Sequence, residues 1–141
     1  MSETPVTGLS HIAIATRDAS LLSASLTGAL GCTVGHEEIL DEGTLRVLFL
    51  HLGPVTFELL EPLAPDHTVA KFLDQRGPGL HHVSLEVPDV SQALDRARAA
   101  GVKLVDAEPR EGADGTLVAF LHPKSLGGVL IELCQEGKPT V

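Results

Sequence analysis

The chain carries the same short pattern twice. Residues 8–19 read GLSHIAIATRDA and residues 79–90 read GLHHVSLEVPDV, so that Gly, His and Asp recur 71 positions apart. A second pair of similar stretches, TFELLE at 56–61 and LIELCQ at 130–135, lies 74 positions apart. From His82 onward, polar and apolar residues alternate, which predicts a β-strand. The chain is therefore predicted to contain two copies of one structural unit.

Each copy is predicted to have the element order β-α-β-β-β. The expected strands lie at 11–16, 32–39, 45–52 and 55–60 in the first copy and at 80–87, 102–107, 116–122 and 129–134 in the second, with helices at about 20–30 and 90–100. Asp18 or Ser20 is expected to cap the first helix and Asp89 the second, because these side chains accept bonds from the first turn. The packed side of the first helix is expected to comprise Leu21, Leu22, Ser25, Leu26 and Ala29.

These elements predict an α+β fold made of two βαβββ modules. Residues 1–64 form the first module, 65–78 a connector and 79–141 the second, with 1–7 as a frayed lead-in and 136–141 as a short tail. The connector has apolar residues at helical spacing. Neither module can close its sheet alone, so we expect the two sheets to curl around a shared cavity, within one domain of about 8–137.

Composition and charge argue against several classes of function. Only 3% of the residues are aromatic and the net charge is −9, which disfavours base stacking and repels a phosphate backbone, so no nucleic-acid partner is expected. Cys32 and Cys134 lie in apolar contexts without CxxC spacing, which is typical of reduced, buried thiols in a cytoplasmic protein. No apolar run approaches the ~18 residues that span a membrane.

Each copy places a His at the start of its first strand and a Glu within its last one. These residues are His11 and Glu58, then His82 and Glu132. Burying an unpaired carboxylate is costly, so each Glu needs a cationic partner, for which Arg46 or Lys103 is the alternative to a metal. The repeat favours one shared metal ion. Two imidazoles and two carboxylates suit Co²⁺, Mn²⁺, Ni²⁺ or Zn²⁺ better than Ca²⁺, and Co²⁺ is our first choice.

The doubled layout resembles the vicinal oxygen chelate superfamily, which includes glyoxalase I, extradiol dioxygenases and small drug-sequestering proteins. Within it, the chain is most similar to the methylmalonyl-CoA epimerases, over roughly residues 9–135. The stretches that resemble them are SHIAIA at 10–15, FELLEPL at 57–63, VAKFL at 69–73, GLHHV at 79–83 and AFLHPKSLGGVLIEL at 119–133.

The resemblance implies a fold, a ligand set and a reaction. His11, Glu58, His82 and Glu132 match the metal ligands of the family, in which the second ligand is Gln or Glu. The implied reaction interconverts (R)- and (S)-methylmalonyl-CoA through an enolate, with two carboxylates on opposite faces of the α-carbon. Glu132 matches one of these bases. Glu42 matches the other base, although the Gln that follows this base in the family is absent here. Asp41 is therefore kept as the alternative candidate for the second base.

The resemblance also implies a CoA substrate and a homodimer. On an acidic protein, the CoA phosphates need local cations, and the candidates by loop position are Lys71, Arg76, Arg110 and Lys124. Two other functions stay open at this point. One is a glyoxalase I-type isomerase acting on a glutathione thiohemiacetal, and the other is a non-catalytic protein that binds a small molecule in the cavity.

Overall fold

The computed structural model of the protein describes residues 6–137. Two compact units make up this part of the chain, one of residues 11–81 and one of residues 82–137 together with 6–10. Across the described residues there are eight β-strands and three α-helices, so the predicted α+β class is confirmed. Most of the expected lead-in and tail, residues 1–5 and 138–141, lies outside the described residues.

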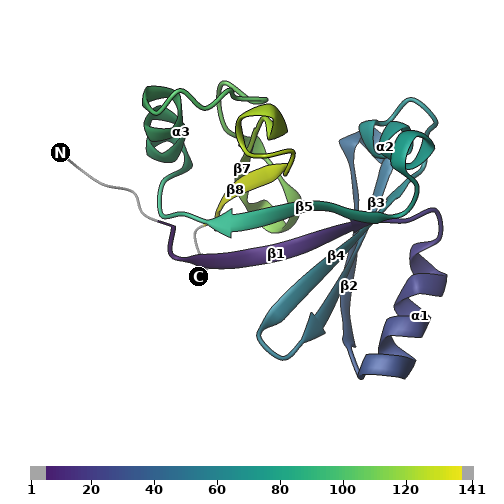
Figure 1. Ribbon diagram of the computed structural model, residues 1–141. Coiled ribbons are helices and arrows are strands. Elements are labelled where there is room, and N and C mark those ends of the chain that lie inside the picture. The colour runs from purple at the N-terminus through teal and green to yellow at the C-terminus, as the bar shows by residue number, and fades with distance from the viewer. Residues whose placement is uncertain (1–5, 138–141) are drawn as a thin grey trace. The chain divides into compact units, whose positions relative to one another are not determined.

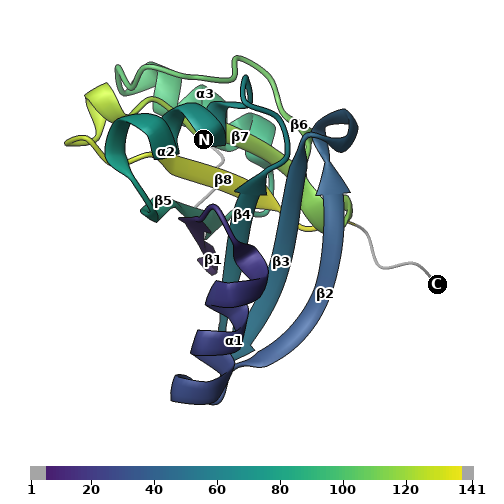
Figure 2. The same ribbon diagram turned by 90° about the vertical axis from the view of Figure 1, so that its right-hand side faces the viewer.

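The unit of residues 11–81 is a four-stranded sheet with two helices. Its elements are β1 (Gly8–Ala15, which begins in the other unit), α1 (Ala19–Leu30), β2 (Thr33–Leu40), β3 (Leu45–Leu52), β4 (Val55–Pro62) and α2 (Thr68–Arg76). The strand order is β2-β3-β4-β1, with β1 parallel to β4 and the other pairs antiparallel. Helix α1 packs on β2, β3 and β4, as Figures 1 and 2 show, over a core that includes Leu50 and Leu59.

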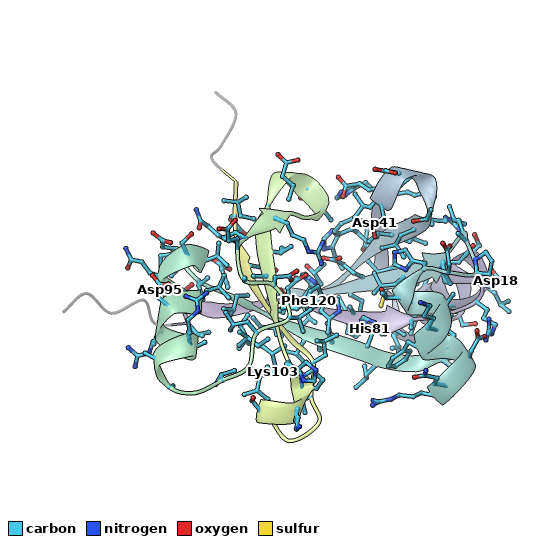
Figure 3. All side chains as sticks on the ribbon, turned by 90° about the horizontal axis from the view of Figure 1, so that it is seen from above. Asp18, Asp41, His81, Asp95, Lys103 and Phe120 are labelled. Carbon is cyan, nitrogen blue, oxygen red and sulfur yellow. The ribbon has the colours of Figure 1, made fainter. Side chains whose placement is uncertain are left out.

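Helix α1 begins where expected, but its buried face differs from the predicted one. Asp18, labelled in Figure 3, caps the helix by accepting a bond from the Leu21 N–H at 3.0 Å. The helix therefore begins at Ala19, and the side that packs inward has the spacing i, i+3, i+4, i+7. Its members are Ala19, Leu22, Ser23 and Leu26. The predicted packed side was wrong for Leu21, which is 65% exposed, and for Ser25 and Ala29.

The unit that contains residues 82–137 repeats this plan. Its elements are β5 (Gly79–Glu86, which begins in the other unit), α3 (Val90–Ala99), β6 (Arg110–Glu111), β7 (Leu117–Leu121) and β8 (Ile131–Gln135). The strand order is β5-β8-β7-β6, with β5 parallel to β8. Helix α3 lies against β7 and β8 (Figure 1), over a core that includes Val90, Leu94 and Leu133.

The strand register confirms that the two copies are structurally equivalent. Glu58 on β4 pairs with Ala13 on β1 and Phe49 on β3. In the other unit Glu132 takes the same place, with Ser84 on β5 and Phe120 on β7 as its neighbours. The first N–H of each helix also has an equivalent partner. In α1, Ala19 donates to Glu61 Oε1 at 2.8 Å, and in the second unit Val90 donates to Gln135 Oε1 at 2.9 Å.

One predicted strand is absent from the described residues. Residues 102–107 form only an isolated bridge, from Leu104 to Leu121, and the short strand β6 lies instead in what was expected to be a loop. The N–H groups of Val105 and Asp106 share the carbonyl oxygen of Phe120, at 3.0 and 3.2 Å. The Asp106 side chain also takes the Phe120 N–H at 2.8 Å. Because two N–H groups share the Phe120 carbonyl, the regular hydrogen bonding of a strand cannot continue along β7. Residues 102–107 therefore pack beside β7 without forming a strand.

No helix among residues 6–137 has the length and apolar character required to cross a membrane. Cys32 and Cys134 are both buried and are not joined in a disulfide, so the expected burial of the two thiols is confirmed.

Candidate active site

In the unit of residues 11–81, the predicted His and Glu meet. His11 Nδ1 lies 2.9 Å from Glu58 Oε2. Their strands are parallel neighbours with Ala13 opposite Glu58, and His11 lies on the same buried face of β1 as Ala13 because alternate residues of a strand share a face. The exposed fractions of His11 and Glu58 are only 6% and 8%.

In the unit that contains residues 82–137, the second pair also meets. His82 Nε2 lies 3.9 Å from Glu132 Oε2, and the residues are 7% and 6% exposed. The hydroxyl of Ser84, which is 0% exposed, donates to Glu132 Oε1 at 2.8 Å. The His82 ring packs edge-on against Phe120, with 5.0 Å between ring centroids. Glu132 is therefore held by a serine that has no counterpart in the first unit, where Ala13 takes its place.

The ion-pair alternative fails for both glutamates. Arg46 pairs with Glu37 and Glu61 instead, at 3.0 and 3.3 Å, and the hydrogen bond to Glu37 is the largest cause of its raised pKa. Among residues 6–137, no ion pair joins Arg46 or Lys103 to Glu58 or Glu132. Each buried carboxylate thus faces an imidazole. Imidazole nitrogens and carboxylate oxygens are the donors that first-row divalent ions accept, so these residues fit a metal.

The turn between β2 and β3 carries the expected second base in an unusual conformation. Asp41, Glu42 and Gly43 have φ values of 54°, 57° and 88°, so three residues in succession are left-handed. Residues other than glycine rarely adopt this conformation, and when they do they often belong to functional sites. The N–H and hydroxyl of Thr44 both donate to the Asp41 carbonyl, at 3.2 and 2.6 Å.

The two acids of this turn differ in their contacts. Asp41 Oδ2 lies 2.7 Å from His67 Nε2. Glu42 is exposed, and no hydrogen bond or ion pair joins its carboxylate to any residue from 6 to 137. Sequence reasoning missed His67, because its contact to Asp41 joins positions 26 apart that share no periodic pattern.

A large part of the chain, including this turn, matches a known family. Residues 10–120 match the profile of the Glyoxalase/Bleomycin resistance protein/Dioxygenase superfamily. The chain belongs to this superfamily. An ethylmalonyl-CoA/methylmalonyl-CoA epimerase of Cereibacter sphaeroides is 38% identical over 129 residues, which cover 90% of this chain and 96% of that protein.

Solved structures of superfamily members agree. The crystal structure of methylmalonyl-CoA epimerase from Mycobacterium tuberculosis has a TM-score of 0.91 and 36% identity, and the match covers 98% of this chain and 93% of that one. A methylmalonyl-CoA epimerase in complex with methylmalonyl-CoA and NH4+ has a TM-score of 0.87 and 33% identity, with coverage of 94% and 96%. The resemblance drawn from the sequence is confirmed.

The candidate phosphate-binding cations of this superfamily member are all exposed. Lys71 and Arg76 lie on helix α2 and not in a loop as predicted, and Lys124 lies in a short 3-10 helix after β7. The Arg76 guanidinium lies 5.7 Å from the centroid of the Phe72 ring. Arg110 lies 5.5 Å above the ring of Phe120 and 3.4 Å from Asp106. Because Phe120 contacts His82, one ring separates Arg110 from the His82–Glu132 pair.

A second histidine precedes His82 and differs from it. Burial lowers the pKa of His81 to about 4, with smaller contributions from the charges of His67 and Arg76. His81 is therefore neutral at pH 7. Its ring packs edge-on against Phe72, with 4.9 Å between centroids.

Proposed function

We propose that the protein is an epimerase that interconverts (R)- and (S)-methylmalonyl-CoA. The observation that carries this proposal is the buried imidazole–carboxylate pair present in both copies of the repeat. The chain also matches the Cereibacter sphaeroides epimerase over 96% of that protein and the Mycobacterium tuberculosis epimerase over 93% of that chain. Those relatives favour the epimerase over the glyoxalase I-type isomerase and the non-catalytic binding protein that the sequence left open.

Four side chains are proposed to hold one divalent ion: His11, Glu58, His82 and Glu132. When bound, the ion supplies positive charge that stabilises the negative charge developing on the substrate carbonyl. Co²⁺ is the proposed ion, with Mn²⁺, Ni²⁺ and Zn²⁺ as alternatives because they accept the same nitrogen and oxygen donors.

Two carboxylates are proposed to move the proton. The substrate's α-carbon lies between a thioester and a carboxylate, so its C–H bond is acidic, and inversion needs one group on each face. Glu42, as a carboxylate, takes the proton from one face, and the C–H electron pair passes to the thioester oxygen. Glu132, which enters this step protonated, gives its proton to the opposite face of the α-carbon, where the electron pair returns to form the new C–H bond. Exchange with solvent then restores the starting proton on each carboxyl group. The reverse reaction exchanges these roles. Glu42 is preferred to Asp41 because the Asp41 carboxylate is already bonded to His67.

Arg110 is the proposed contact for an anionic group of the substrate near the reacting carbon. It lies one aromatic ring from His82, and its guanidinium can bind a carboxylate through two N–H groups. Lys71 and Lys124 are proposed to meet the CoA phosphates further out. We also propose a cytoplasmic homodimer, for which β2, the last strand at one end of the sheet, offers the exposed Val34 and Ile39; light scattering would test the dimer.

The function is tested by following deuterium into the substrate. Purified protein with Co²⁺ is incubated in D₂O with (R)- or (S)-methylmalonyl-CoA, and with ethylmalonyl-CoA, acetyl-CoA and a glutathione thiohemiacetal as comparisons. We expect each methylmalonyl-CoA configuration to gain deuterium at the α-carbon and to convert to the other, while acetyl-CoA does not exchange. Turnover of the thiohemiacetal without exchange in any malonyl-type thioester would overturn the proposal.

Ser84→Ala is expected to lower the affinity for Co²⁺ by about 10- to 100-fold, because hydrogen bonds to a metal-binding carboxylate orient it. Ser84 is the buried donor to Glu132 Oε1, at 2.8 Å. Isothermal titration of the metal-free protein measures the affinity. Ser91→Ala, at an exposed position of α3, is the control and should bind as the wild type does. Equal affinity of Ser84→Ala and wild type would contradict the role of Ser84.

A further inference from the structure

We propose that Asp41 and His67 form a clasp that positions Glu42 for proton transfer. This inference rests on the function proposed above, since it assigns the support of one of the two bases. The clasp is the contact between His67 Nε2 and Asp41 Oδ2, at 2.7 Å. Asp41 directly precedes Glu42 in the chain, so holding one residue restricts the backbone of the other.

The second contact of His67 indicates which ring nitrogen carries the hydrogen in the neutral imidazole. His67 caps α2, where its Nδ1 accepts a bond from the Val69 N–H at 3.0 Å. A nitrogen that accepts a bond carries no hydrogen, so in the neutral ring the hydrogen lies on Nε2. His67 therefore donates to the Asp41 carboxylate. One imidazole joins the turn of Glu42 to the first turn of a helix.

The helix at the His67 end of the clasp is packed against the sheet. Helix α2 packs against β4 and buries Val69, Ala70 and Leu73. The side chain of His67 is only 11% exposed, whereas that of Asp41 is 46% exposed. The clasp thus fixes an exposed turn to a buried anchor. The far end of the turn is fixed independently, because the Leu63 N–H donates to the Thr44 carbonyl at 2.8 Å.

The second copy of the turn shows what the clasp adds. Thr116 donates through its N–H and hydroxyl to the Ala113 carbonyl, at 3.2 and 2.7 Å, as Thr44 does to Asp41. Asp114 takes the place of Glu42 and is left-handed, with φ of 60°. Ala113 takes the place of Asp41, offers no carboxylate, and is not among the left-handed residues of the described chain. An additional left-handed residue and the clasp occur together, and only in the turn that carries Glu42.

We infer that the clasp offsets the cost of the left-handed conformation at Asp41. Without it, Asp41 is expected to relax to an ordinary conformation, which re-aims the Glu42 side chain. Misplacing a reacting group affects the chemical step more than it affects substrate binding. Loss of the clasp should therefore lower kcat and leave KM nearly unchanged.

Two variants of His67 separate the clasp from the helix cap. His67→Asn keeps an oxygen that caps α2, since Asn is among the best N-caps, but its amide is too short to reach Asp41. His67→Gln gives up the cap and extends an amide N–H toward the position of Nε2. We expect His67→Asn to lower kcat for epimerisation by about 10- to 100-fold with KM within about twofold, and His67→Gln to stay within about threefold of wild type. Asp41→Asn, which still accepts the bond and tolerates the left-handed conformation, should behave like His67→Gln.

The two proposals fail in different ways. If the wild type epimerises substrate and His67→Asn keeps its kcat, or if His67→Gln loses as much as His67→Asn, the clasp does not position Glu42. If the wild type epimerises no malonyl-type thioester, the proposed function is wrong, and this inference with it. Circular dichroism and bound Co²⁺, measured for each variant, show whether a lost rate comes from a lost fold.

Discussion

Glu42→Gln is expected to lower the epimerisation rate by a factor of about 10³, since general-base catalysis by a positioned side chain contributes roughly 10²–10⁴. Gln has nearly the same shape as Glu but cannot accept a proton at neutral pH. Because Glu42 is exposed and has no partner among residues 6–137, the variant should fold and bind Co²⁺ as the wild type does.

The variant also tests the two-base mechanism. With Glu42 removed, Glu132 alone still removes and returns a proton on its own face. Deuterium should then enter only one configuration of methylmalonyl-CoA, without conversion to the other. Mass spectrometry and chiral separation measure the two processes in the same sample. Equal exchange in both configurations would contradict the assignment of Glu42, and Glu108→Gln, at an exposed site, is the matched control.

Glu132→Gln is expected to have an effect at least as large, because Glu132 is proposed to be both a metal ligand and a base. The epimerisation rate should fall by about 10³ or more, and Co²⁺ should no longer stabilise the protein. A thermal melt shows this directly: added Co²⁺ raises the Tm of the wild type and leaves that of the variant unchanged. In the metal-free state the variant should be no less stable than the wild type, because an amide is less costly to bury than a carboxylate.

Glu136→Gln is the matched control for this variant, since it lies nearby in the chain and is exposed. It should retain both the rate and the Co²⁺-dependent rise in Tm. A Glu132→Gln protein that keeps either property would show that Glu132 is not both ligand and base.

The two buried glutamates hold equivalent places in the repeat but differ in their surroundings. Glu58 Oε2 faces His11 at 2.9 Å, and its neighbour on β1 is Ala13. Glu132 lies further from its histidine and is held by the hydroxyl of Ser84. A serine that fixes one oxygen suits a carboxylate whose position matters for proton transfer. This difference agrees with assigning the base to Glu132 and only a ligand role to Glu58.

The repeat in the sequence was enough to predict the α+β class and the equivalence of His11 with His82 and of Glu58 with Glu132. Strand periodicity places His11 and His82 on buried faces, and the burial of a Glu in each last strand follows from its apolar neighbours. These features depend on local pattern, which a single sequence displays.

Features that depend on contacts between distant positions were missed. The face of α1 was wrong because its packing against β2, β3 and β4 decides which side of the helix is buried. The strand at 102–107 was wrong because Asp106 bonds to the backbone of β7. No feature of the sequence indicated the contact of His67 with Asp41. A polar residue at position 67 is expected as a helix cap whatever else it contacts.

The central claim is that both halves of the chain bind one and the same ion. Equilibrium dialysis against Co²⁺, followed by elemental analysis, measures the number of ions per chain in the wild type, His11→Ala and His82→Ala. We predict one ion per chain in the wild type and none in either variant, although each variant alters only one half. Two ions per wild-type chain, or one ion retained after either substitution, would contradict the account.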